Sequence, residues 1–525
     1  MKLGIALRKT EYQNAVYPQN LLCNHIPTCT EYIKYFKIYK NIRKSQKLMN
    51  YNQIEEYILN IPKFRPEGSI EQTRKFYEFL GKPGKSVNLV HVAGTNGKGS
   101  TCAYMNSVLT EAGYKVGMFT SPHLVSVRER MRINQELISE QEFVDIFSKL
   151  EGKIGCYNQG CGLIVNTETD IAIDKDEYDR GVGTVEEVSK EQEQINIKEQ
   201  YLPTFYEFLF FMAMLYFEEQ NTDIIILETG LGGRLDATNV IDAPKVAVIT
   251  EIGKDHMEYL GDTFEKIAEE KAGIIKSGSA VVYSGNRQEV VEVIERKAKE
   301  LDVLCKCMEK IEKEDYRFVD KKIDFSFYSR YYGYIPISVS TCAIYQVENV
   351  CLALAAIEEL ELKISKEAMQ SGIKRCKWEG RMEEILPGVF LDGAHNEDGI
   401  DAFVTSVKAD GCKGRRWLLF SAVADKEYKI MKDKLIKSDL FDYVFASPLK
   451  TARGISKDEL KEIFAQTSLE NTVSDRKVGI FDSAYEGFGK ILSLKKDEDF
   501  VYVTGSLYLV GEIKEKCSEA QPKVV

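Results

Sequence analysis

A glycine-rich loop near residue 100 has the composition of a phosphate-binding turn. Its seven residues are Gly94-Thr95-Asn96-Gly97-Lys98-Gly99-Ser100. Backbone N–H groups in such a loop, with the N-terminus of a following helix, form a cradle for phosphate oxygens. Lys98 can neutralise charge on the β- and γ-phosphates, and Ser100 can approach a bound metal ion. The loop departs from the strict phosphate-loop spacing, because Gly99 stands between Lys98 and Ser100; a plain glycine-rich turn is the alternative.

An acidic residue followed by a run of glycines is the second group that can do chemistry. Glu228 ends an apolar segment, 223–227, that predicts a buried strand, and the run continues to Asn239. In open α/β sheets, ligands bind at the carboxyl ends of the strands. A carboxylate there, beside a phosphate loop, is a natural Mg²⁺ ligand, and Arg234 can steady a carboxylate or a phosphate. A turn with surface charges is the alternative.

Three further segments carry weaker signals. His256 follows a strand predicted at 245–250, and Asp392 and His395 follow another at 389–391. Lys271 stands in a predicted helix, where a carbamate on its amine would turn the cation into an anion able to bind a metal. Taken alone, each has an ordinary interpretation: a core histidine, a polar turn or a solvated helix lysine.

Alternation of strand-like and helix-like segments predicts the fold class of the chain. Short apolar runs precede helical segments at 87–112, 223–301 and 389–422. This pattern is typical of a P-loop, doubly wound, mostly parallel α/β sheet with right-handed crossovers. The glycine-rich loop then joins a strand at 87–92 to a helix at 101–112. A further helix is predicted at 139–150, with Ser139 as its N-cap and Glu142 three residues on.

The length of the chain predicts two domains, because 525 residues exceed what one core usually supports. The alternation starts again after Pro336. We therefore predict an N-terminal extension at 1–48, an ATP-binding domain at 49–338 and a smaller α/β domain at 339–525. Residues 170–200 are rich in charged residues and poor in large apolar ones, which predicts a partly disordered surface insertion.

The bulk composition excludes several classes of protein. A net charge of −11 argues against a nucleic-acid binder, whose footprint is basic. No run of eighteen apolar residues occurs, so no membrane span is expected. The 12 cysteines and five histidines lack the spacing of a zinc site, which predicts reduced thiols in a cytoplasmic protein. The first 47 residues lack the pattern of a secretory signal.

In their order along the chain, these segments resemble one family. It is the folate branch of the ATP-dependent Mur ligases, which contains folylpolyglutamate synthase and dihydrofolate synthase. The resemblance covers about 50–511 and rests on HVAGTNGKGS at 91–100, TSPHL at 120–124, ETGLGGRLDATN at 228–239, EKAGIIK at 270–276, GR at 380–381, DGAHN at 392–396 and TGSLY at 504–508. It implies a Mur-ligase-like central domain followed by a smaller, Rossmann-like C-terminal domain.

The resemblance also implies nucleotide and metal ligands. The loop from Thr95 to Ser100 matches the ATP-binding segment of the family, and further ATP contacts are expected from Asn349, Arg381 and Asp392. The Mg²⁺ ligands are expected to be Ser121, Glu228 and His256, so the metal role moves from Ser100 to Ser121. Lys271 matches a carbamylated lysine that bridges a second Mg²⁺.

The expected substrate contacts come from both domains. The pterin is expected to lie along Thr204-Phe205-Tyr206-Glu207 and Leu235-Asp236-Ala237. His395 and Ser506 are expected to contact the incoming glutamate. The residues expected to act in catalysis are Lys98, Lys271, Asp392 and His395. Two departures from the family bear on these expectations: Glu251 stands where relatives usually have a small residue, and the 170–200 insertion precedes the pterin segment.

The reaction that the resemblance implies joins L-glutamate to the γ-carboxylate of a folate. The carboxylate attacks the γ-phosphoryl group of ATP, and the amine of glutamate then displaces phosphate. ATP and Mg²⁺ are required, K⁺ or another monovalent cation is a further candidate, and a monomer is expected. Whether dihydropteroate is also a substrate stays open.

Two alternatives to this reaction are kept. One is another amide ligase of the same superfamily, although nucleotide-sugar substrates would need a larger N-terminal domain than the extension here. The other is a P-loop NTPase switch that hydrolyses ATP without joining two substrates.

Overall fold

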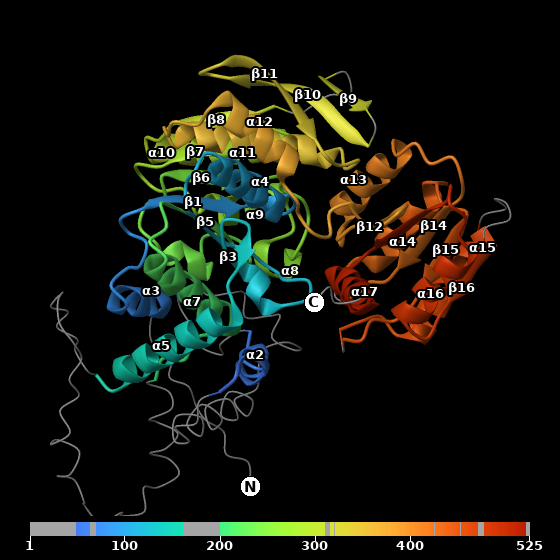
Figure 1. The fold of residues 1–525 in the computed structure, drawn as a ribbon, viewed down its shortest axis with the longest axis horizontal. Helices are drawn as coiled ribbons and strands as arrows, with labels where there is room; N and C mark the ends of the chain where they lie inside the picture. The colour runs from blue at the N-terminus through green and yellow to red at the C-terminus, as the bar shows by residue number, and fades with distance from the viewer. Residues whose placement is uncertain are drawn as a thin grey trace, which may run out of the picture.

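The computed structural model describes residues 49–63, 70–160, 200–309, 315–319, 321–424, 426–451, 453–470 and 477–520 (Figure 1). The predicted extension at 1–48 and almost all of the predicted insertion at 170–200 lie outside these residues. Within the described ranges, none of the helices has the length and apolar surface that a bilayer-spanning segment requires.

In the described part of the chain, eight strands form the first sheet, in the order β4-β3-β2-β5-β1-β6-β7-β8. The strands from β2 to β8 in this order pair in parallel, and β3 and β4 add antiparallel pairings at one edge. The predicted doubly wound, mostly parallel sheet is therefore confirmed. The strands are β1 (Asn88–Ala93), β2 (Val116–Phe119), β3 (Met131–Ile133), β4 (Glu136–Leu137), β5 (Ile224–Glu228), β6 (Val246–Ile249), β7 (Ala280–Ser284) and β8 (Cys305–Met308).

Helices cover both faces of the first sheet, because successive side chains of a strand point to opposite faces and both sets are apolar here. Val246 and Val248 of β6 face one core, and Ala247 and Ile249 face another. The first face packs against α4 (Lys98–Glu111), α11 (Tyr345–Glu359) and α12 (Lys366–Arg375). The opposite face packs against α2 (Tyr51–Leu59), α3 (Ile70–Phe79), α5 (Glu140–Asn158), α7 (Phe205–Glu219), α9 (Phe264–Ala272) and α10 (Gln288–Glu300).

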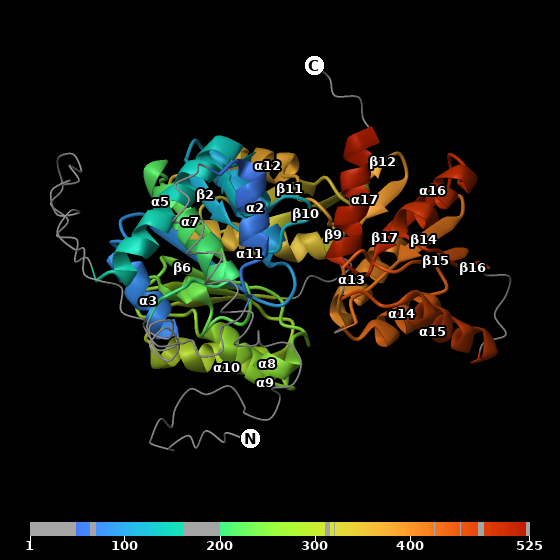
Figure 2. The same cartoon turned by 90° about the horizontal axis from the view of Figure 1, so that it is seen from below.

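A second sheet with its own helices lies beside this unit in both views (Figures 1 and 2). Its described strands run in the order β12 (Glu383–Leu386), β13 (Val389–Leu391), β17 (Phe500–Thr504), β14 (Arg416–Phe420), β15 (Tyr443–Ala446) and β16 (Lys477–Ile480). All pairings except β12 with β13 are parallel. One face packs against α13 (Glu397–Lys408), α14 (Tyr428–Lys437) and α15 (Lys457–Glu470), and the other against α16 (Ala484–Leu494) and α17 (Leu507–Ala520).

The segment between the two sheets differs from the predicted domain boundary. A small antiparallel sheet of β9 (Tyr316–Val319), β10 (Lys322–Ser329) and β11 (Gly333–Val339) was not predicted. Helices α11 and α12 follow residue 338, yet their apolar residues complete the core around α4 on the first sheet. We therefore propose that the first domain extends to Arg375 and that the second begins at Glu383, in place of the boundary at 338/339.

Candidate active site

The phosphate loop, residues 94–100, joins β1 to α4. Gly97 is the N-cap of α4 in a left-handed conformation, with φ 87°, and a Cβ there would lie 2.2 Å from Asn349 Oδ1. A Cβ on Gly94 would lie 1.8 Å from Thr250 Oγ1. Both close approaches admit only glycine. The N–H groups in the first turn of α4 have no intrahelical partners, so the loop keeps the donors that a phosphate cradle requires.

Two polar side chains of the loop are held by the protein itself. Lys98 Nζ donates to the carbonyls of Gly94 and Thr95, each at 3.1 Å. Ser100 is buried, and its Oγ accepts a hydrogen bond from Gln346 Nε2 at 3.3 Å. The Ser100 hydroxyl therefore packs against α11, whereas the Lys98 ammonium contacts backbone carbonyls of the loop.

Glu228 and Ser121 meet at the carboxyl ends of β5 and β2. Glu228 is only 3% exposed, and its Oε2 accepts a hydrogen bond from the Ser121 N–H at 2.9 Å. Burial raises the pKa of this carboxyl, and the Lys98 ammonium opposes that effect. A buried carboxylate is costly unless a cation is near it, so this position suits a metal ligand.

His256 follows β6 and precedes α8 (Met257–Leu260). Burial lowers the pKa of its imidazole to about 4, so the ring is neutral at pH 7 and has a lone pair for a metal. Glu228 lines the same pocket as Gly99 of the loop. Asp255, next to His256, contacts Asn396, whose amide also donates to Asn96 of the loop. Among the described residues, no three His, Cys, Asp or Glu side chains converge as a metal site. A set of Ser121, Glu228 and His256 fits Mg²⁺, which takes few protein ligands and keeps positions for phosphate oxygens and water.

Lys271 is buried in α9 against the phosphate loop. It is 4% exposed, and its Nζ donates to the Gly94 carbonyl at 2.6 Å. Burial, with the nearby charge of Lys98, lowers the pKa of its amine to about 7. The alternative of a solvated helix lysine is therefore wrong. At neutral pH a large share of such an amine is uncharged and nucleophilic.

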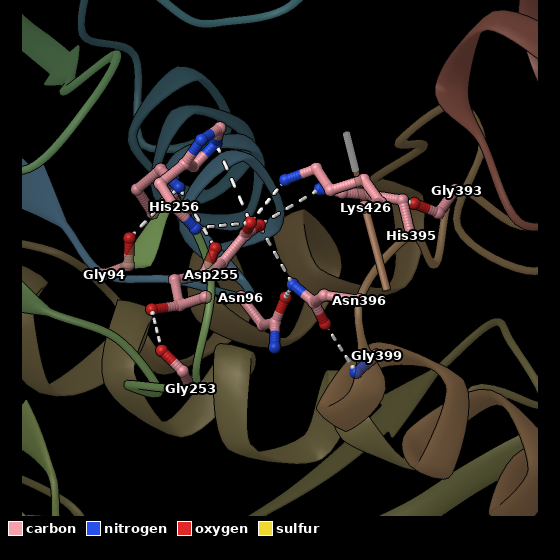
Figure 3. Close-up of polar contacts among 12 residues, drawn as sticks. Gly94, Asn96, Gly253, Asp255, His256, Gly393, His395, Asn396, Gly399 and Lys426 are labelled. Carbon is pink, nitrogen blue, oxygen red and sulfur yellow. Dashed lines mark hydrogen bonds and ion pairs between the residues drawn. The ribbon is translucent and has the colours of Figure 1, made fainter. Parts of the chain in front are cut away.

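A polar cluster joins the two domains beside the phosphate loop (Figure 3). The Asp255 carboxylate pairs with Lys426 and lies 3.7 Å from His395 Nε2. Asn396 Nδ2 donates to Asn96 Oδ1 of the loop at 3.0 Å. Burial alone would raise the pKa of Asp255, but the Lys426 ammonium and the nearby imidazoles hold it well below its usual range. The cluster brings the predicted residues Asn96 and His395 into one network.

A pocket between the domains adds residues of both to the site. It is lined among others by Gly99, Ser121, Glu228, Trp378, Arg381 and Leu507. A Cβ on Gly99 would lie 3.0 Å from the Trp378 ring, so the indole packs on the start of α4. Arg381 thus lines the same pocket as Ser121 and Glu228, and its contact with ATP stays a prediction.

Three residues of this region, Lys426, Trp378 and Arg130, were not predicted from the sequence. Arg130 is buried; its Nε donates to His123 Nδ1 at 2.9 Å, and its guanidinium lies over the Phe205 ring at 5.1 Å. Lys426 follows β14, so a cation after the end of a parallel strand was the available signal. No comparable signal marked Trp378 or Arg130.

Asp392 is held by groups on both sides of the domain boundary. Its Oδ2 accepts hydrogen bonds from Tyr345 Oη of α11 at 2.6 Å and from the Met382 N–H at 3.0 Å. Its Oδ1 accepts one from the Ala394 N–H at 2.9 Å. Burial raises the pKa of this carboxyl. These contacts fix the turn that carries His395, and a contact of Asp392 with ATP stays a prediction.

The segments predicted to lie along the pterin flank Glu228. Tyr206 Oη donates to the Glu228 carbonyl at 2.8 Å. Asp236 Oδ2 accepts hydrogen bonds from the Gly230 and Leu231 N–H groups, at 2.8 and 3.0 Å, and so shapes the turn after β5. Its neighbours on either side, Leu235 and Ala237, are partly exposed.

Other predicted substrate residues have structural contacts. Thr204 and Glu207 form a capping box at the start of α7, so their side chains hold that helix. Phe205, between them, is partly exposed. Ser506 follows β17, is buried, and its Oγ accepts a hydrogen bond from the Tyr508 N–H at 3.2 Å. Contacts of these residues with a substrate stay predictions.

Known proteins resemble this chain in sequence and in fold. Residues 186–357 match the Mur ligase middle domain. The chain is 33% identical to the dihydrofolate synthase/folylpolyglutamate synthase of Bacillus subtilis over 485 residues, which cover 89% of this chain and 99% of that protein.

Two solved structures extend the similarity. FolC of Escherichia coli, in complex with DHPP and ADP, has a TM-score of 0.69 and 26% identity over 90% of this chain and 98% of that one. The folylpolyglutamate synthase of Thermotoga maritima has a TM-score of 0.69 and 27% identity over 90% and 97% of the two chains. The phosphate loop, the Ser121–Glu228 pair and the two α/β sheets thus occur in a chain that belongs to the dihydrofolate synthase/folylpolyglutamate synthase family.

Proposed function

We propose that this chain is an ATP-dependent ligase that joins L-glutamate to the γ-carboxylate of a folate through an acyl phosphate. The observation that carries the proposal is the pocket between the domains, whose walls include Gly99 of the phosphate loop, the Ser121–Glu228 pair and Arg381. A pocket with these walls can hold the terminal phosphates of a nucleotide beside a second substrate. Relatives named dihydrofolate synthase/folylpolyglutamate synthase support the choice of substrates.

In this proposal Ser121, Glu228 and His256 hold a Mg²⁺ ion, and Lys271 as a carbamate holds a second. Bound there, Mg²⁺ offsets the negative charge of the transferring phosphoryl group. Two observations support this assignment. The Glu228 carboxylate is buried, so a cation beside it offsets the cost of its charge. The His256 imidazole is neutral at pH 7, so it has a lone pair for a metal ion.

The proposed reaction has two displacements. The substrate carboxylate attacks the γ-phosphorus of ATP, and the bond to ADP breaks. Lys98 and the free N–H groups at the start of α4 donate to the phosphate oxygens during this step. The amine of glutamate, after losing a proton, attacks the acyl carbon; the amide bond forms and phosphate leaves. The turn of His395 and Asn396 covers the loop from the second domain and limits the access of water to the acyl phosphate.

An assay of ADP release separates this proposal from its alternatives. The purified protein is given ATP, Mg²⁺ and L-glutamate, with tetrahydrofolate, with dihydropteroate or with neither. We expect ADP release to require both a pterin substrate and glutamate, with one new amide bond per ADP by mass spectrometry. Turnover of dihydropteroate would add the dihydrofolate synthase step. Equal ADP release without pterin or glutamate would favour the NTPase switch and contradict the ligase.

Removal of the loop lysine tests the phosphate assignment. Lys98→Ala should lower the ligation rate by about 100-fold or more, because one preorganised charge is lost at the transferring phosphate. Its circular dichroism spectrum should match that of the parent protein. Lys149→Ala is the control, since Lys149 pairs with Glu219 on the surface of α5 and α7. A Lys98→Ala protein that ligates at the parent rate would refute the assignment.

A further inference from the structure

The side chain of Lys426 connects the two domains. It lies on the connection between β14 and α14 in the second domain, and its ammonium pairs with the carboxylate of Asp255 in the first. The Lys426 side chain is 11% exposed and that of Asp255 is 10% exposed. Little water reaches this pair. Separating its two charges, or removing one of them, would leave the other buried without a counter-charge, so the pair resists displacement.

Asp255 connects Lys426 to the turn that precedes α13. One carboxylate oxygen, Oδ1, accepts hydrogen bonds from the Lys426 ammonium and, at 2.8 Å, from the backbone N–H of His256. The other, Oδ2, lies 3.3 Å from Asn396 Nδ2 and 3.7 Å from His395 Nε2. Lys426 therefore fixes the orientation of a carboxylate that two side chains of the second domain face.

The same turn is fixed at its other polar atoms. In the neutral imidazole, His395 Nδ1–H donates to the Gly393 carbonyl at 2.7 Å; Nε2, the nitrogen without a proton, lies 3.7 Å from Asp255 Oδ2 and donates no hydrogen bond to it. Asn396 Oδ1 accepts the Gly399 N–H at 2.8 Å as the N-cap of α13, and its Nδ2 donates to Asn96 Oδ1 in the phosphate loop. The turn is thus seated on the loop, and the Asp255 carboxylate lies between Lys426 and Asn396 (Figure 3).

We propose that Lys426 is a positioning residue for the ligation: by holding Asp255, it seats His395 and Asn396 over the phosphate loop. The inference rests on the proposed function, because it assigns Lys426 to the step in which the second domain covers the activated carboxylate. Lys426 touches no reacting atom in this scheme. Its effect reaches the site through Asp255, and a small displacement of a positioned group is enough to slow a reaction strongly.

Lys434 provides a matched control. It lies on α14, the helix that follows the connection carrying Lys426, and its ammonium pairs with Glu397 at 3.0 Å and with Asp401 at 2.6 Å, both within the second domain. Replacement of either lysine by methionine removes one charge and keeps an unbranched side chain. Only the Lys426 substitution removes a pair between the domains.

The test measures ligation of L-glutamate to tetrahydrofolate by the full chain. We expect Lys426→Met to lower kcat/KM for glutamate by about 10- to 100-fold. Lys434→Met should stay near the parent value. Lys426→Met should also lower the thermal midpoint, because the Asp255 carboxylate stays buried without its cation, so kcat/KM is measured per folded protein at a temperature well below the midpoints of both variants. Lys426→Arg, which keeps the charge, should recover part of the loss. A merely structural role would lower the thermal midpoint and the yield of active protein without a specific change in kcat/KM for glutamate.

A double-mutant cycle tests the route through Asp255. The protein with both Asp255→Asn and Lys426→Met should have the same kcat/KM as Asp255→Asn alone, because Lys426 has no role once the carboxylate is gone. Losses that add in the cycle, or a Lys426→Met protein as active as Lys434→Met, would overturn the positioning role. If Lys426→Met fails to fold, Lys426→Gln takes its place in the same cycle. A parent protein that ligates glutamate to no folate would instead refute the proposed function.

Discussion

At the scale of single residues, Lys271 shows how burial prepares a side chain for chemistry. Its amine is enclosed by α9 and the phosphate loop, and the Lys98 charge adds repulsion, so its pKa falls to about 7. A neutral amine can add to CO₂; a C–N bond forms, a proton leaves, and a carbamate anion results. That anion would be attracted by Lys98, whereas the ammonium is repelled by it. Carbamylation would thus replace a repulsive pair by an attractive one.

Chemical rescue tests this role of Lys271. Lys271→Ala should lose most of the ligation activity, because the proposed carbamate, which would hold the second Mg²⁺, can no longer form. Added short carboxylic acids should restore part of the rate, since a free carboxylate can occupy the space of the carbamate. Lys276→Ala is the control: Lys276 also has a pKa lowered by burial, to about 8, but it donates to the carbonyls of Asn239 and Ile241. Rescue of both variants, or of neither, would count against the carbamate.

At the scale of the element, the loop before α4 depends on glycines for two separate reasons. Gly97 needs a left-handed backbone and also lies against Asn349. Gly113, after the other end of α4, has a similar φ of 92° but open space around it. A substitution at Gly113 would therefore report backbone strain alone, whereas one at Gly97 would report strain together with a steric clash against Asn349.

Alanine at these two glycines should give different results. Each substitution should lower the free energy of unfolding by about 1–2 kcal/mol through left-handed strain. Gly97→Ala should lower it further and weaken ADP binding, because its Cβ displaces Asn349 from the loop. Chemical denaturation and calorimetric titration with ADP measure the two effects. Equal ADP affinity in Gly97→Ala and Gly113→Ala would show that Asn349 can move without cost to the nucleotide site.

Local signals in the sequence predicted many elements but not all of their ends. The N-cap Ser139 with Glu142 predicted the start of α5 correctly. The helix was predicted to end at Leu150, before Gly152, yet it continues to Asn158 because Ile154 packs into the core. Helix α4 starts at Lys98 instead of 101, since its N-cap is a left-handed glycine and not a polar residue. Tertiary packing and backbone strain decided these ends, and neither is visible in a propensity pattern.

The site was predictable where its residues follow parallel strands. Glu228 ends β5 and His256 follows β6, and these strands lie on either side of β1 and its loop, so the strand-end rule was sufficient to select both residues as candidates. Ser121 follows β2 without a signal in its residue type, and only the family resemblance selected it. Lys426 was not predicted because its place in the site depends on its ion pair with Asp255, 171 residues away in the sequence. An ion pair between domains forms only when the two domains pack in one orientation. The spacing of residues in the sequence does not reveal that orientation.

At the scale of the whole molecule, the core beneath the phosphate loop includes helices that come much later in the sequence than the loop itself. Helix α11 comes more than 200 residues after α4, yet both pack on the same face of the first sheet. Residues on either side of the predicted boundary at 338/339 therefore share one apolar cluster. The alternation of strands and helices did not reveal this, because α11 and α12 have no strand between them.

Substitutions in the two cores should report on this arrangement. Leu354→Ala, in α11, should lower the free energy of unfolding by about 2–5 kcal/mol and speed amide hydrogen exchange in β1 and α4. Phe464→Ala, in α15, should instead speed exchange in β14 and β15. Mass spectrometry of deuterated peptides resolves the two regions. Faster exchange in β14 with unchanged β1 for Leu354→Ala would place α11 with the second domain.

The environment of α4 has a consequence for genetic variation in this chain. Every residue from Ser100 to Leu109 is buried, so this ten-residue stretch of the helix offers no solvent-facing position where the residue type is free to vary. Its far end lies about 15 Å from the nucleotide loop. A saturation screen for growth should therefore score a continuous stretch of intolerant codons that runs well past the loop. Inactive alleles in that stretch would reflect a displaced helix, although the altered residues contact no ligand.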